Sequence, residues 1–223
     1  MAQVILVTGG TLRVQSAGNA WLVPTGRALW LPAGEAQTIT APALSTVALQ
    51  FAPEVTPELT ADLPAQSLAL AVSPLLRELV LELARRCPIA EDDHTSRHFA
   101  HAAIDCVARA EPLPLSVPLP RDPRAMRLAK LLQADPAMST DLTTLARQCG
   151  ASPRTLQRLF LRQTGLPFRQ WRQRLRLIHG PGLLSEGASV TEAGLAAGYA
   201  GTSAFIAAFG RHFGMTPGEF GRG

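Results

Sequence analysis

The chain has 223 residues, enough for about two domains with a buried core, and 47% of them are apolar. No run of roughly 18 apolar residues occurs, so the sequence predicts no membrane-spanning helix. Residues 1–10 lack the basic leader of a signal peptide. The three cysteines (Cys87, Cys106 and Cys149) cannot all pair and show no zinc-binding spacing, which fits the reducing cytoplasm and excludes a disulfide framework.

The formal net charge of +4 is unevenly distributed along the chain. Residues 1–120 hold 7 Lys/Arg and 11 Asp/Glu, a net charge of −4, whereas residues 121–223 hold 14 and 6, a net charge of +8. This asymmetry predicts a neutral or acidic module joined to one that binds polyanions. A solvated basic face would have the same composition, so the choice depends on the motifs.

Short strands dominate the expected structure of the first fifty residues. Residues 4–8 and 11–14 flank Gly9-Gly10, a pair typical of a two-residue hairpin turn. Further strands are expected between Gly- and Pro-containing turns, at 20–23, 28–31 and 37–40. Strands this short and numerous predict a β-sandwich or small barrel. The Pro- and Ala-rich segment 52–73 is expected to be irregular.

Two helices and a proline-rich segment come next. Ser73 and Pro74 predict the start of a helix that ends before Pro88, and a second helix is expected from about 96 to 110. Both have apolar stripes broad enough for a core or a dimer partner. Residues 111–120 contain four prolines, which predicts a semi-rigid linker. We therefore expect three regions, at 1–110, 111–121 (the linker) and 122–223.

The C-terminal region contains two helix-turn-helix units joined by an Arg-rich segment. The expected order is a helix, the first unit, the joining segment, the second unit and a closing segment, at about 123–134, 141–164, 167–184, 190–213 and 215–220. Each unit has a short helix, a turn with Gly150 or Gly198, a Ser/Thr-rich cap and a second apolar-periodic helix. Two such units can place two helices in successive major-groove segments of double-stranded DNA. The pattern predicts a transcription regulator and no catalytic residues.

In the first unit, Ser152 and Pro153 are expected to start the second helix, whose residues Leu156, Leu159 and Phe160 face inward. The opposite face carries side chains that hydrogen-bond base edges, Arg to guanine and Gln to adenine. We expect base contacts from the first residues of this helix: Arg154, Thr155, Gln157 and Arg158.

In the second unit, Phe205, Ile206 and Phe209 are expected to form the core. The rest of its second helix offers mostly Ala and hydroxyl side chains, Ala208 among them. These suit methyl contacts to thymine or shape recognition better than a strong base code. We expect base contacts here from Thr202 and Ser203.

Arginines around the joining segment are expected to contact phosphates, which would make binding salt-dependent. Trp171, Leu175 and Ile178 lie at i, i+4 and i+7 and should anchor this segment between the units. The predicted phosphate contacts are Arg162, Arg169, Arg172 and Arg211. Arg174 and Arg176 lie beside the same stripe.

Several motifs resemble the AraC/XylS family of bacterial transcription regulators over about 141–220. They are Gly-Ala-Ser-Pro-Arg-Thr-Leu-Gln-Arg-Leu-Phe at 150–160, Thr-Gly-Leu-Pro-Phe at 164–168 and Phe-Gly-Met-Thr-Pro at 213–217. The resemblance implies seven helices here, with two recognition helices about one DNA turn apart. Residues 10–34 similarly resemble the cupin sensor barrel of this family, and the next two helices its dimerisation pair.

The resemblance thus implies an α+β fold, with a short cupin-like β-barrel or sandwich, two helices, and then an all-α domain with two helix-turn-helix units. It further implies a homodimer, a small-molecule effector and recruitment of RNA polymerase at a promoter. The barrel departs from the family because its first strands are missing and Glu35-Ala-Gln37 stands where a His often lies. We therefore expect no metal and no other cofactor.

The joining segment also departs from the family at His179-Gly-Pro-Gly182. An interior Pro costs a helix about 3 kcal/mol and each Gly about 1 kcal/mol. We expect the helix to end near His179 and restart at Pro181, which would misalign the second unit on DNA. Replacing Pro181 by Ala and Gly182 by Glu should then raise both stability and affinity. Gly194 and Gly210, where the family usually has Ala and a basic residue, should weaken binding further.

Two alternatives belong to other functional classes. His94, His98 and His101 lie at i, i+4 and i+7, near Asp92 and Asp93, which could place metal ligands of an enzyme on one helix face. A hydrophilic helix start explains the same residues. The other alternative is a family member with impaired DNA binding that acts through protein–protein interaction, by forming mixed dimers.

Overall fold

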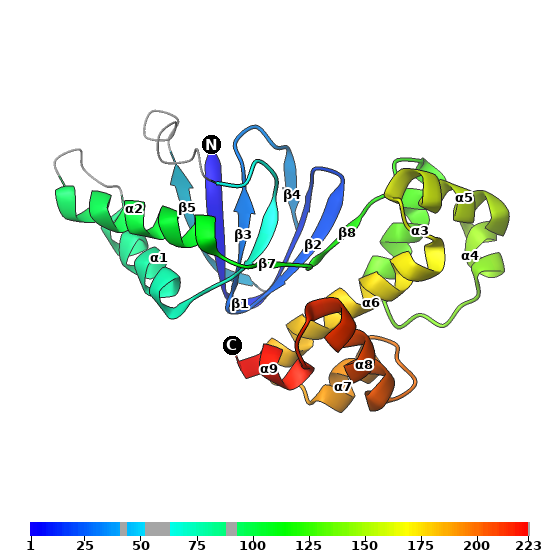
Figure 1. The fold of residues 1–223 in the computed structure, drawn as a ribbon. Coiled ribbons are helices and arrows are strands. Elements are labelled where there is room, and N and C mark those ends of the chain that lie inside the picture. Colours follow the sequence, from blue (N-terminus) through cyan, green and yellow to red (C-terminus); the bar gives the residue numbers. More distant parts are fainter. Residues whose placement is uncertain (41–43, 52–62, 88–92, 223) are drawn as a thin grey trace. The chain divides into compact units, whose positions relative to one another are not determined.

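The computed structural model describes residues 1–40, 44–51, 63–87 and 93–222 (Figure 1). Two compact units divide these residues: 1–17 with 23–113, and 18–22 with 114–223. The short insertion 18–22 in the second unit comes from the strand-rich part of the sequence. Among the described helices, none has both the length and the apolarity needed to cross a bilayer.

The first unit contains a curled antiparallel sheet, as the sequence predicts. Its order is β7-β6-β3-β1, and β4 and β5 also pair with β1. The strands are β1 (Ala2–Ser16), β3 (Arg27–Leu31), β4 (Gln37–Ile39), β5 (Leu44–Phe51), β6 (Leu68–Ala71) and β7 (Pro112–Leu113). Followed by helices, this sheet confirms the α+β fold class.

The predicted hairpin at Gly9-Gly10 is wrong, because β1 continues through both glycines. The strand pairs with β5 on either side of them, and the register shifts between Val7 and Gly9. Gly10, just after this shift, has a φ of +78°, which glycine adopts without strain. Pairing with β5 therefore overrides the local turn signal. The prediction that 52–73 is irregular is also wrong at β6, while 52–62 lie outside the described residues.

Helices α1 (Pro74–Arg86) and α2 (His94–Arg109) bury an apolar face against this sheet. Both lie close to the predicted bounds. The side chain of Ser73 accepts a hydrogen bond from the Leu76 backbone N–H at 3.1 Å, which confirms the predicted cap. Leu75 of α1 is 61% exposed. The shared core includes Leu6, Trp30, Leu76, Val80, Leu83, Ile104 and Val107.

The second unit begins with two paired strands. Residues 19–21 of β2 (Asn19–Pro24) pair antiparallel with β8 (Ser116–Pro118). Ala20, Leu22, Val117 and Leu119 join the hydrophobic core of the C-terminal helices. The segment 111–121, expected to be a linker, thus contains β7 and β8, and β8 belongs to the core of the second unit.

Seven helices follow, at the positions that the sequence predicts. They are α3 (Pro123–Ala134), α4 (Leu142–Gln148), α5 (Pro153–Thr164), α6 (Phe168–Ser185), α7 (Val190–Ala196), α8 (Thr202–Phe213) and α9 (Pro217–Arg222). Figure 1 shows α6 running from the group formed by α3, α4 and α5 to the group formed by α7, α8 and α9. Helix α6 contacts α5, α7, α8, α9 and β8.

The predicted break at Gly180 and Pro181 is wrong, since α6 is continuous from Phe168 to Ser185. Gly180, Pro181 and Gly182 are all buried. A Cβ atom on Gly180 would lie 2.8 Å from Cζ of Phe205, so the glycine allows α6 and α8 to approach closely. Burial against α8 stabilises the helical path despite its poor local propensity.

The close packing also bears on Gly194 and on the double change of Pro181 and Gly182. At Gly194, expected from the sequence to weaken DNA binding, a Cβ would lie 3.0 Å from Cβ of Phe205, so this glycine too permits a tight helix contact. Because Gly182 is buried, Glu at that position would bring a carboxylate into the core. The double change of Pro181 and Gly182 should therefore lower stability.

Two glycine-to-alanine variants form a matched pair that tests this packing. In Gly210→Ala the new methyl has only the Met215 carbonyl oxygen near it, at 4.0 Å, so helix propensity should raise stability by about 1 kcal/mol. In Gly180→Ala the clash with buried Phe205 costs about 1–3 kcal/mol and should lower stability overall. Thermal unfolding followed by circular dichroism measures both, and equal stabilisation by the two variants would contradict the packing argument.

Candidate nucleic-acid interface

The first helix-turn-helix unit is built by short-range caps. Asp141 accepts hydrogen bonds from the backbone N–H groups of Thr143 and Thr144, at 2.8 and 3.1 Å, and thereby starts α4. A hydrogen bond from the Thr144 hydroxyl, at 2.8 Å, and these backbone bonds lower the pKa of the Asp141 carboxyl. Gly150 makes the turn at a φ of +70°. Ser152 then caps α5 by accepting from the N–H of Thr155 at 3.2 Å.

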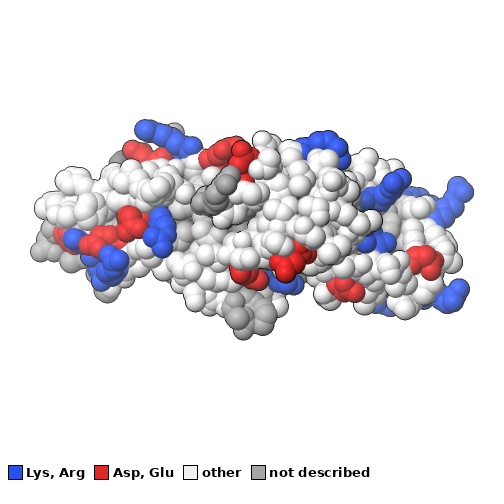
Figure 2. Space-filling view, turned by 90° about the horizontal axis from the view of Figure 1, so that it is seen from below, with Lys and Arg blue, Asp and Glu red and all other residues white. Residues whose placement is uncertain are grey.

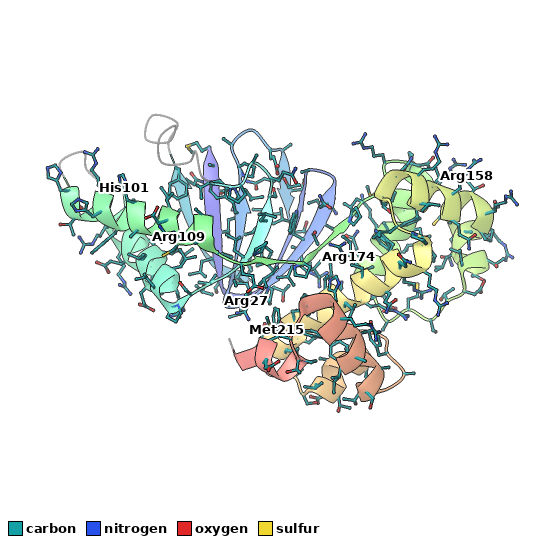
Figure 3. The ribbon with its side chains drawn as sticks, viewed as in Figure 1. Arg27, His101, Arg109, Arg158, Arg174 and Met215 are labelled. Atoms are coloured by element: carbon teal, nitrogen blue, oxygen red, sulfur yellow. The ribbon has the colours of Figure 1, made fainter. Side chains whose placement is uncertain are left out.

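Helix α5 buries one face and exposes the other. Leu156 and Phe160 are fully buried, and the Phe160 ring meets Trp171 of α6 edge-on, with 4.9 Å between centroids. The outward side chains are those predicted for base contacts: Arg154, Gln157 and Arg158 are exposed, and Thr155 is half-buried. Figure 3 shows Arg158 on α5 among these outward side chains. Arg162 is also exposed, one turn further along.

The second helix-turn-helix unit repeats this plan with different caps. Ser189 and Glu192 form a reciprocal capping box at the start of α7, and Gly198 makes the turn at a φ of +79°. Helix α8 has Gly201 at its N-cap and no side-chain cap. Thr202 donates to the Thr191 hydroxyl at 3.1 Å, so its oxygen connects the two helices of the unit.

The predicted inward face of α8 needs correction at two positions. Phe205 and Phe209 are buried as expected, but Ile206 is 40% exposed and Ala208 is 4% exposed. The reason is the helical period, since Phe205, Ala208 and Phe209 lie at i, i+3 and i+4 and leave Ile206 on another face. The outward face of α8 consists of Ser203, Ala204, Ile206, Ala207 and Arg211. Applied strictly, that period would have identified Ile206 from the sequence.

Three arginines of α6 donate hydrogen bonds to backbone carbonyl groups. Arg172 donates to Met138, and Arg176 donates to Pro136 at 3.0 Å. Arg174 donates to Ser116 at 2.8 Å (Figure 3). Burial lowers the pKa of both Arg172 and Arg174, and the carbonyl contacts offset part of the cost of burying their charges. Phosphate contact by Arg172 stays a prediction, and this guanidinium already has a partner within the fold.

The remaining predicted phosphate contacts lie at the surface. Arg162, Arg169 and Arg211 are exposed. Figure 2 shows Lys and Arg side chains at its right-hand end. In Figure 1 this end of the second compact unit holds α4 and α5. This charge distribution suits a polyanion at the outer face of α5.

Strand β8 contacts both the joining helix α6 and α8, the second helix of the second helix-turn-helix unit. Nε1 of Trp171 donates to the Pro118 carbonyl at 2.6 Å, beside the Arg174 bond to Ser116. On α8, Nε2 of His212 lies 3.1 Å from the Pro114 carbonyl oxygen. A carbonyl can only accept, so Nε2 carries the proton. Trp171 is fully buried, which confirms its predicted core role.

In the first compact unit, Glu35 stands where the resemblance to cupins predicts a His. Glu35 accepts hydrogen bonds from the hydroxyls of Ser16, at 2.7 Å, and Ser67. His94, His98 and His101 are exposed on α2, and Asp92 lies outside the described residues. Across the part of the chain that the structure describes, no three His, Cys, Asp or Glu side chains are grouped to hold a metal ion.

A cavity of about 430 Å³ opens between the end of β6, the start of α1 and the end of α2. Its lining combines apolar and charged side chains, among them Leu76, Asp105, Cys106 and Arg109. The cavity lies entirely within the first compact unit, residues 1–17 with 23–113.

Two helix-turn-helix units on one shared helix, each with an outward polar second helix, define a DNA-binding transcription regulator. The family model described as "Helix-turn-helix domain" matches residues 145–223. The HTH-type transcriptional regulator NimR of Escherichia coli (strain K12) is 30% identical over 218 residues, which cover 98% of this chain and 78% of NimR. The chain belongs to the AraC/XylS family of helix-turn-helix transcription regulators.

Two other similarities each cover about half of the chain. The HTH-type transcriptional regulator RipA of Corynebacterium glutamicum is 40% identical over 106 residues, 48% of this chain and 32% of RipA. The solved DNA-binding domain of AdpA, in complex with a target DNA, is 27% identical, with a TM-score of 0.42 over 45% of this chain and 91% of that domain.

The His212 contact predicts a pH dependence of stability. Burial, and to a lesser degree the charge of Arg174, lower the pKa of His212 below its usual 6.5, although the Pro114 bond opposes this shift. The unfolded chain then binds a proton more readily than the folded chain, so stability should fall as the pH falls through 6.5. Thermal midpoints measured between about pH 7.5 and pH 5.5 should drop less in His212→Gln than in the wild type. Parallel pH profiles for the two proteins would contradict this account.

Proposed function

We propose that the chain binds a specific DNA sequence through α5 and α8, at two half-sites about one helical turn apart. The observation that carries this proposal is the unbroken α6, which joins two capped helix-turn-helix units across Pro181. A continuous helix keeps both recognition helices on one body, which simultaneous insertion into successive major-groove segments requires.

Within α5 we assign base contacts to Arg154, Thr155, Gln157 and Arg158. Arg154, Gln157 and Arg158 are exposed, and all four follow directly after the Ser152 cap, where a recognition helix enters the groove. Arg and Gln can each form paired hydrogen bonds with one base edge, so this helix supplies most of the sequence specificity.

Within α8 we assign base contacts to Thr202 and Ser203 and add Ile206. The exposed Ile206 side chain can contact thymine methyl groups, as can the neighbouring alanines. Such contacts favour A·T pairs without a strict code, so the second half-site should be less well defined than the first.

Phosphate contacts are assigned to Arg162, Arg169 and Arg211, with Arg172 as a further candidate. Each contact that neutralises a phosphate releases counterions and steepens the salt dependence of binding. These arginines position the protein on the duplex and leave base discrimination to α5 and α8.

We further propose that the chain acts as a homodimer, responds to a small-molecule effector and recruits RNA polymerase. The exposed Leu75 on α1 provides apolar surface for a second copy. The cavity beside Arg109 and Asp105 suits a small effector with both apolar and hydrogen-bonding groups. Ligands that raise the thermal midpoint of the wild type should fail to do so in Arg109→Met if they bind there.

The alternative of an impaired family member acting through mixed dimers loses its main support. It depended on a helix break at Gly180 and Pro181, and α6 is continuous there. A chain that pairs with a relative but selects no DNA motif would restore it.

Selection of binding sites from random-sequence duplex DNA by the purified chain tests the proposal. We expect an enriched motif with a strong half-site and a weaker A·T-rich one, centred about 10 base pairs apart. Retention of DNA without any enriched motif would contradict sequence-specific binding.

Two variants separate base contacts from phosphate contacts. Gln157→Ala should weaken binding to the selected site by about 10- to 100-fold and relax the preference at one base pair. Arg162→Ala should weaken binding to all sequences and reduce the salt slope by about 1. Arg127→Ala, which removes an exposed arginine of α3 outside the assigned interface, is the control. Identical effects of Gln157→Ala and Arg162→Ala on every sequence would contradict the assignment.

A further inference from the structure

The two edges of β8 make different hydrogen bonds. One edge pairs with β2: the Leu22 N–H donates to Leu115 at 3.0 Å, and the Leu119 N–H donates to Gly18 at 2.7 Å. Backbone groups alternate between the edges of a strand, so the groups of 114, 116 and 118 lie on the other edge. We call the carbonyl groups of Pro114, Ser116 and Pro118 the β8 carbonyl row.

Side chains, in place of a third strand, supply the partners of this row. Trp171 donates to Pro118, Arg174 donates to Ser116, and His212 donates to Pro114. Donor side chains can satisfy carbonyl oxygens, but they cannot accept from backbone N–H groups. Pro114 and Pro118 have no backbone N–H. The edge of β8 that faces donor side chains therefore has two fewer N–H groups in need of an acceptor.

The three donors come from both sides of the weakest point of α6. Trp171 and Arg174 precede Pro181, whereas His212 lies on α8, in the second helix-turn-helix unit. Pro181 offers no N–H to the carbonyl of Leu177, so one helical hydrogen bond is missing between the units. Strand β8 therefore contacts α6 before Pro181 and α8 of the second helix-turn-helix unit, independently of the part of α6 around Pro181.

We propose that β8 fixes the distance between the recognition helices α5 and α8, with Trp171, Arg174 and His212 as its positioning residues. This inference rests on the proposed binding to two half-sites. Its consequence is that β2, a strand encoded within the N-terminal region, forms part of the apparatus that sets half-site spacing. Loss of His212 removes the hydrogen bond between β8 and α8, and loss of Arg174 removes one of the two between β8 and α6. Neither change alters the outward face of α5.

The test uses the full chain and three kinds of duplex. One carries the site selected by the wild type, a second has its half-sites moved apart by two base pairs, and a third carries the stronger half-site alone. The test variants are Arg174→Met and His212→Phe, and His212→Gln, which keeps a donor for Pro114, is the conservative rescue. Arg127→Met and His101→Phe remove the same side-chain types from exposed positions outside the row and serve as matched controls.

We expect the wild type and both controls to lose at least about tenfold in affinity when the spacing changes by two base pairs. For Arg174→Met and His212→Phe, the same change of spacing should lower the affinity by less than about threefold. Their affinity for the single half-site should stay within about twofold of the wild-type affinity. His212→Gln should recover the wild-type spacing preference. A merely destabilised protein would lose affinity for all three duplexes alike.

Unchanged spacing preference in both test variants would overturn the inference while leaving the proposed function intact. A wild type that selects no paired site would instead overturn the proposed function. A measurement without DNA then still decides the inference. Spin labels on Gln157→Cys and Ser203→Cys, with Cys87 and Cys106 replaced by Ser, report the distance between α5 and α8. His212→Phe should broaden that distance distribution, and an unchanged distribution would overturn the inference.

Discussion

The arrangement of the second compact unit, which holds both helix-turn-helix units, depends on the burial of both halves of α6. Its first half places Trp171 and Leu175 in the core that α5 forms, and its second half places Gly180 against Phe205 of α8. Because both contacts are apolar and close, the helix remains continuous through a proline that would break an exposed helix. Two helix-turn-helix units packed on one continuous helix are what distinguish this fold from two separate helix-turn-helix motifs.

The polar contacts around α6 determine which arginines remain available for DNA. Arg174 and Arg176 donate to backbone carbonyl groups within the second compact unit, whereas Arg158 and Arg162 are exposed on α5. A basic sequence therefore contains two populations of charge, one that holds the fold together and one that faces outward. The difference between α5, rich in Arg and Gln, and α8, rich in Ala, predicts unequal half-sites.

The sequence predicted elements well where short-range chemistry decides them. Caps such as Ser73 and Ser152, and the glycine turn at Gly150, act within four residues and place helix boundaries correctly. It failed where distant residues decide: pairing with β5 carries β1 through Gly9, and burial against Phe205 keeps α6 helical at Gly180. The prolines around β8 resembled a linker, yet proline is equally suited to a strand edge that needs no donors. Outward residues of α5 followed from periodicity, but Arg174 required the fold to show its carbonyl partner.

Hydroxyl-radical footprinting of the wild-type chain on its selected DNA tests the central claim most directly, because it shows whether both recognition helices engage one duplex. The account predicts two protected segments on the same face of the helix, centred about 10 base pairs apart and both present at the same protein concentration. A single protected segment, or a second one that appears only at much higher concentration, would show that α6 does not hold the two units in register.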